Sequence, residues 1–159
     1  MVAKSQKTSQ FATERFSLFM KFKLFINMKE IRKLVRKILS EHMSFKDLKS
    51  VDNYADELFS DVGVDIDFSD HFVDRLNDPR NGKDIEPAEL NSLFLKAHNK
   101  YKEYIKNMPL DSEKVVKDTQ TAINIPMVAV DKTKSGKVVR AKTIMRKKDF
   151  LSQTPILKV

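Results

Sequence analysis

The chain has 159 residues, a formal net charge of +8 and no cysteine. A chain of this length suits one domain, or one domain with an N-terminal extension. The absence of cysteine excludes disulfide bonds and thiolate metal ligands, three separated histidines argue against a zinc site, and no apolar run reaches the length of a membrane-spanning helix. We therefore expect a soluble protein that needs no metal or other cofactor.

The positive charge is unevenly distributed along the chain. Residues 1–60 carry a balance of +5, residues 61–113 a balance of −5 and residues 114–159 a balance of +8. Such asymmetry favours an anionic partner, nucleic acid above all, for the C-terminal part. A lysine-rich surface that only keeps the protein soluble explains the same charges equally well.

Residues 1–27 read as a basic, phenylalanine-rich N-terminal extension or arm. Between Phe16 and Phe25 the phenylalanines recur at a spacing of three, which is near the period of a helix. A docking helix, a membrane-surface helix and a transit peptide share this composition, whereas translation from Met28 would make the segment an upstream extension. We favour an extension or a disordered arm, followed by a single domain over residues 28–159.

Three segments have apolar residues at the intervals of three and four that predict amphipathic helices. The first covers residues 28–42 and has a basic face, which a solvated surface explains better than a nucleic-acid contact. The second begins after Ser44 and ends at Gly63. The longest begins with Pro87 as its first residue and stops before Pro109.

The C-terminal third changes to the composition of strands. Residues 122–131 and 137–147 are rich in Val, Ile and Thr and flank a turn that ends at Gly136, so they predict an antiparallel hairpin. Residues 115–121 and 154–159 predict further strands, and the alternation over residues 62–67 also suits a short one. The expected fold is α+β, with N-terminal amphipathic helices packed on one face of a small C-terminal antiparallel sheet.

Alternation along residues 137–147 assigns the side chains to two faces of that sheet. The face expected to meet the helices carries Val139, Ala141, Thr143 and Met145, and the opposite face carries Arg140, Lys142, Ile144 and Arg146. The second face would present its cations to a polyanion, which predicts salt-sensitive binding without sequence preference.

A second group of cations lies in residues 68–81. His71 and Arg75 are four apart, so they share one face of a predicted helix that Ser69 or Asp70 would cap. Arg80 and Asn81 follow in the next turn. An imidazole beside two permanent cations suits phosphate chemistry.

The order F-S-x-H-F-x-x-R at 68–75, R-N at 80–81, I-x-x-x-E-L at 85–90 and K-T-I-M-R-K-K-D-F at 142–150 resembles phage-encoded members of the superfamily of barnase, EndoU, colicin and RelE-like nucleases. The resemblance covers about residues 66–152. It implies a small α+β ribonuclease that cleaves RNA without a metal ion, by attack of the ribose 2′-hydroxyl on the adjacent phosphate. It also implies a phage protein located in the host cytoplasm or in the virion.

This chemistry needs a proton acceptor, a proton donor and cations for the charged phosphorane. The residues that we expect to be catalytic are His71, Arg75, Arg80, Thr143 and Arg146, and those expected to bind substrate are Asn81, Lys83, Arg140 and Lys142. Each has a structural alternative: His71 would bond a backbone carbonyl, Arg75 would pair with Asp70 or Asp74, and Thr143 would be buried.

The competing hypothesis is a non-enzymatic phage protein. It would be a virion or host-takeover component that uses the same fold to bind nucleic acid or another protein. A phage or host protein partner would then contact residues 11–39. No second strong acid or base accompanies His71 in the sequence, which weakens the hypothesis of an enzyme.

Overall fold

The structure describes most of the chain after residue 42. The computed structural model describes Ile31, residues 43–133 and residues 136–159, without the side chains of residues 131–136. The predicted extension, the partner segment and, apart from the helical Ile31, the predicted helix over residues 28–42 lie outside the described residues. In the described part of the chain no helix is both long and apolar enough to cross a membrane.

The first described helix begins after Ser44, as predicted, and the Ser44 side chain caps it by accepting a hydrogen bond from the backbone N–H of Asp47. Gly63, at φ +69°, follows the short 3-10 turn that extends this helix, and Pro87 is the first residue of the longest helix. The helices are α2 (Phe45–Phe59), α3 (Asp70–Leu76) and α4 (Pro87–Lys106), with 3-10 turns η1 (Ser60–Val62) and η2 (Pro79–Asn81).

The sheet has six strands in mixed orientation, so the prediction of a purely antiparallel sheet is wrong. Its order is β1-β4-β3-β2-β6, and β5 also pairs with β3. The β3–β4 hairpin is antiparallel as predicted, but β1 runs parallel to β4 and β6 runs parallel to β2. The strands are β1 (Val64–Phe68), β2 (Glu113–Lys117), β3 (Ile123–Thr133), β4 (Gly136–Ala141), β5 (Met145–Arg146) and β6 (Ile156–Lys158).

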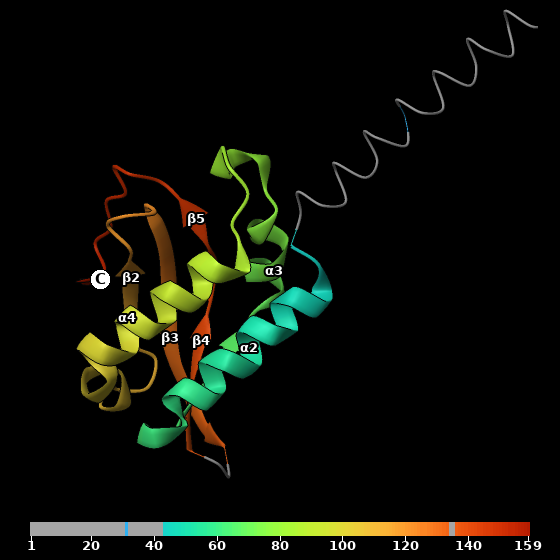
Figure 1. Ribbon diagram of the computed structural model, residues 1–159. Coiled ribbons are helices and arrows are strands. Elements are labelled where there is room, and N and C mark those ends of the chain that lie inside the picture. Colours follow the sequence, from blue (N-terminus) through green and yellow to red (C-terminus); the bar gives the residue numbers. More distant parts are fainter. Residues whose placement is uncertain (1–30, 32–42, 134–135) are drawn as a thin grey trace, which may run out of the picture. The chain divides into compact units, whose positions relative to one another are not determined.

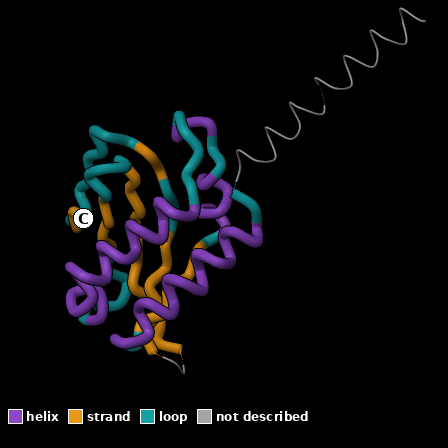
Figure 2. The backbone as a smooth tube through the Cα atoms, viewed as in Figure 1, coloured by secondary structure: helices purple, strands orange, loops and turns teal. Residues whose placement is uncertain are grey.

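Helices α2 and α4 lie together over one face of the sheet (Figures 1 and 2). Their phenylalanines Phe59 and Phe94 are fully buried and belong to one core cluster with strand residues such as Ile125 and Ala129. Burial of these apolar faces is the main favourable contribution to folding. The predicted packing of helices on one sheet face is therefore confirmed for α2 and α4, and α3 lies at the end of β4, where the candidate site is found.

Candidate functional site

A pocket of about 460 Å³ lies between α3, η2 and the segment that follows β4. It is lined by all five residues predicted to be catalytic and by one predicted to bind substrate: His71, Arg75, Arg80, Asn81, Thr143 and Arg146. Its other lining residues are Asp78, Ile144, Met145 and Lys147. The structure thus brings together two sequence segments that the prediction could join only through the family resemblance.

Ser69 fixes α3 to the end of strand β4. Its backbone N–H donates to the carbonyl oxygen of Ala141 (3.1 Å), and its hydroxyl donates to the carbonyl oxygen of Lys142 (2.8 Å). The same hydroxyl caps α3 by accepting from the N–H of Phe72 (3.2 Å). His71 follows two residues later, and its exposed side chain makes no hydrogen bond within the described residues. The expected alternative of a bond from His71 to a backbone carbonyl is therefore not observed.

Thr143 reaches the pocket because the second hairpin strand is interrupted. Strand β4 ends at Ala141 and β5 begins at Met145. Across the break Ile144 is buried at 1% exposure, whereas Thr143 is half-buried and lines the pocket. The predicted alternation of faces is therefore wrong beyond Lys142, because side chains alternate regularly only along a continuous strand.

Asp78 holds the two arginines of the helix and turn. One of its oxygens lies 2.5 Å from Nη1 of Arg75, and the same oxygen lies 2.6 Å from Nη2 of Arg80. The Nε of Arg80 is 3.0 Å from both carboxylate oxygens. The structural alternative for Arg75 was an ion pair with Asp70 or Asp74. The observed partner is Asp78, at the helical spacing of three.

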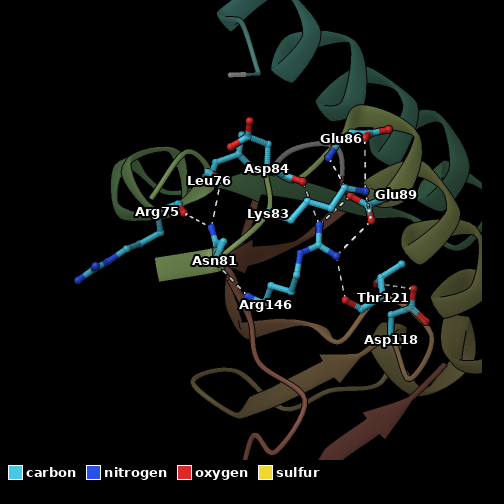
Figure 3. A network of polar contacts seen from close by, with 10 residues as sticks. All are labelled: Arg75, Leu76, Asn81, Lys83, Asp84, Glu86, Glu89, Asp118, Thr121 and Arg146. Atoms are coloured by element: carbon cyan, nitrogen blue, oxygen red, sulfur yellow. Dashed lines mark hydrogen bonds and ion pairs between the residues drawn. The ribbon is translucent and has the colours of Figure 1, made fainter. Parts of the chain in front are cut away.

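Asn81 joins the end of α3 to strand β5 (Figure 3). Its amide nitrogen donates to the carbonyl oxygens of Arg75 (2.9 Å) and Leu76 (3.3 Å), and its amide oxygen accepts from the backbone N–H of Arg146 (3.0 Å). Only 7% of Asn81 is exposed. These contacts make Asn81 a residue that positions the pocket walls, rather than an open ligand for substrate.

Arg146 is tied into the fold through its guanidinium group. Nη1 and Nη2 each donate to one carboxylate oxygen of Glu89, at 3.1 and 2.8 Å, and they also reach the carbonyl oxygens of Thr121 and Asp84. Its Nε is buried and has no hydrogen-bond partner among the described residues. Figure 3 shows the side chain of Arg75 pointing away from this guanidinium. The pocket therefore has two separate sets of cations: Arg75 with Arg80, held by Asp78, and Arg146, paired with Glu89.

The pKa of the Glu89 carboxyl group shows that Glu89 is the charged partner of Arg146 in this ion pair. Burial is the largest influence and raises the pKa of its carboxyl group, but hydrogen bonds from Arg146 and from the backbone N–H of Glu86 outweigh burial and bring the pKa below 4.5. The carboxylate is consequently charged at neutral pH, and it compensates the charge of Arg146.

Three predicted substrate-binding residues are not among those that line the pocket. Lys83 lies 3.5 Å from Glu86 and 3.9 Å from Glu89, Arg140 is 2.6 Å from Asp67, and Lys142 is 2.5 Å from Glu113. Arg140 and Lys142 remain exposed. Arg140 is paired with an acid on the neighbouring strand β1 and Lys142 with an acid on β2, while Arg146 contacts α4, so the three do not form the single cationic face that was predicted.

The sequence reasoning missed Asp78 and Lys147 as pocket residues. Asp78 was assigned only to the turn, although its spacing of three from Arg75 is that of a helical ion pair. Lys147 directly follows Arg146 and was counted only as the end of a predicted strand. In the part of the chain that the structure describes, no three His, Cys, Asp or Glu side chains are grouped so that they could hold a metal ion.

No family model, curated protein or solved structure matches this chain. The resemblance to the nuclease superfamily therefore remains a prediction from its short sequence motifs.

Proposed function

We propose that the pocket binds a phosphate group of a nucleic-acid strand, with RNA as the expected ligand. The observation that carries this proposal is the convergence of Arg75, Arg80 and Lys147 on one concavity, in which Asp78 supplies the only carboxylate among the described lining residues. This leaves an excess of positive charge even after Arg146 and Glu89 are counted as a neutral pair. The preference for RNA rests on the family resemblance.

Guanidinium groups suit this ligand because their planar N–H donors match two oxygens of a phosphate. Arg80 has 71% of its side chain exposed and Arg75 has 31%, so both can reach a bound strand. Thr143 supplies a hydroxyl group to the same pocket. Contacts of this kind position a strand without reading its bases, and they weaken as salt increases.

The test compares two substitutions that remove the same charge, Arg80→Gln inside the pocket and Arg140→Gln on the sheet. Binding of a fluorescein-labelled single-stranded RNA is measured by anisotropy over a range of salt concentrations. We expect Arg80→Gln to weaken binding about tenfold and to reduce the salt slope by about 0.7, and Arg140→Gln to change affinity less than about twofold. Equal effects of the two variants, or no binding by the wild type, would overturn the proposal.

The second candidate function is metal-independent cleavage of the bound RNA, which the presence of His71 in the same pocket favours. An imidazole can take the proton from the ribose 2′-hydroxyl, whose oxygen then attacks phosphorus and expels the 5′-oxygen. That leaving oxygen needs a proton from a second group. Within the described lining His71 is the only imidazole, and Asp78 is engaged by two arginines. Binding is therefore the better supported function.

Cleavage is tested on labelled RNA in the presence of a chelator. His71→Asn should abolish product while RNA binding persists, and His98→Asn, which changes a histidine that pairs with Asp61 outside the pocket, should cleave at the wild-type rate. Full cleavage by His71→Asn would rule out this candidate and leave phosphate binding untouched.

A further inference from the structure

We infer that Asp78 is an internal competitor for the phosphate, so that ligand binding exchanges one anion for another between Arg75 and Arg80. This inference rests on the proposed function and specifies how the same site is regulated. In the protein without ligand, the Asp78 carboxylate would hold the two arginines together until a nucleic-acid phosphate replaces it.

The geometry around Asp78 is that of an arginine clamp on an oxyanion. Arg80 approaches side-on, with Nε 3.0 Å from Oδ1 and Nη2 2.6 Å from Oδ2 of Asp78. Arg75 adds Nη1 at 2.5 Å from Oδ2. A phosphate accepts hydrogen bonds from the same donors in the same side-on manner. The carboxylate therefore occupies the place that a phosphate would take.

Exposure indicates that this contact can be exchanged. The side chains of Arg75 and Arg80 are 31% and 71% exposed, whereas that of Asp78 between them is 16% exposed, so a ligand from solvent meets the guanidinium groups first. Arg146 differs, because its side chain is 15% exposed and bonds to a carboxylate and two carbonyl groups. A ligand would accordingly release Arg75 and Arg80 from Asp78 and leave Arg146 in place.

Asp78 also has a structural task that can be separated from its charge. Its Oδ1 accepts from the backbone N–H of Arg80 at 2.9 Å and so caps the turn η2. Asn at this position keeps an oxygen for that cap but loses the negative charge that holds the guanidinium groups. Asp78→Asn therefore tests the competition with the turn retained.

The experiment measures binding of fluorescein-labelled single-stranded RNA to the full chain by anisotropy at several salt concentrations. Asp78→Asn should bind about tenfold more tightly, with a salt slope steeper by about 0.7, because the pocket gains one uncompensated cation. The control is Asp74→Asn, the same charge change on an exposed residue of α3 that does not line the pocket, which should stay within about twofold of wild type.

The outcomes separate this inference from the proposed function. Weaker binding by Asp78→Asn with intact wild-type binding would make Asp78 a residue that positions the arginines, and equal gains in both variants would indicate a general charge effect; either result overturns the inference alone. No binding by the wild type would overturn the proposed function and the inference with it. If circular dichroism shows that Asp78→Asn is unfolded, Asp78→Ser, which keeps a capping hydroxyl, takes its place.

Discussion

Arg146 and Glu89 are 57 residues apart in the sequence and share two hydrogen bonds where strand β5 meets the first turn of α4. Their side chains are 15% and 18% exposed. Arg146→Gln should lower the free energy of unfolding by about 2–4 kcal/mol, because it leaves a partly buried carboxylate without its charged partner. Urea unfolding followed by circular dichroism measures this loss.

The matched control for this prediction is Arg140→Gln, which breaks an ion pair with Asp67 in which both side chains are more than 40% exposed. A loss below about 1 kcal/mol is expected there. If both variants lose the same stability, the burial of the Arg146–Glu89 pair has no special importance.

The same pair should make the free energy of unfolding depend on pH in the acidic range. The folded-state pKa of Glu89 lies below its ordinary 4.5, so its stabilising effect is fully present above about pH 4.5 and is lost as the pH falls through the folded-state pKa. Arg146→Gln removes most of this dependence. The difference in unfolding free energy between wild type and Arg146→Gln should therefore shrink between neutral pH and about pH 3. A constant difference over that range would contradict the assignment.

Asp52 on α2 should show the opposite dependence. Burial, followed by the nearby carboxylates of Asp56 and Asp67, raises the pKa of Asp52 above its ordinary 3.8. The folded state thus favours the neutral form, and this preference costs stability as the pH rises through the raised pKa. Asp52→Asn should stabilise the protein by a few tenths of a kcal/mol at neutral pH and have no effect below about pH 3.8. Asp74→Asn, on an exposed carboxylate, should change neither value.

Sequence reasoning succeeded where the determinants are local. Ser44, Ser69 and Pro87 mark the starts of their helices through hydrogen bonds and backbone geometry within a few residues. The grouping of His71 with Arg75 follows from the helical spacing of four in the same way.

It failed where distant segments decide the outcome. The parallel edge strands β1 and β6 have five and three residues, and nothing in so short a pattern states which strand lies beside them or in which direction. Likewise the partner of Arg146 is set by the approach of α4, whereas the prediction placed Arg146 on the opposite sheet face by extending the alternation through the break at Thr143.

Asn81 provides a last test, because one side chain connects both walls of the pocket. Asn81→Ala leaves the carbonyl oxygens of Arg75 and Leu76 and the backbone N–H of Arg146 without this partner, and buried polar groups that lose a hydrogen bond cost about 1–3 kcal/mol. Unfolding in urea should show a loss in this range, together with weaker RNA binding because α3 and β5 are no longer held together. Asn107→Ala, which removes an exposed bond to the carbonyl of Glu103, should cost less than about 0.5 kcal/mol and leave RNA binding unchanged. A loss no larger for Asn81→Ala than for Asn107→Ala would show that the pocket walls are held by other contacts.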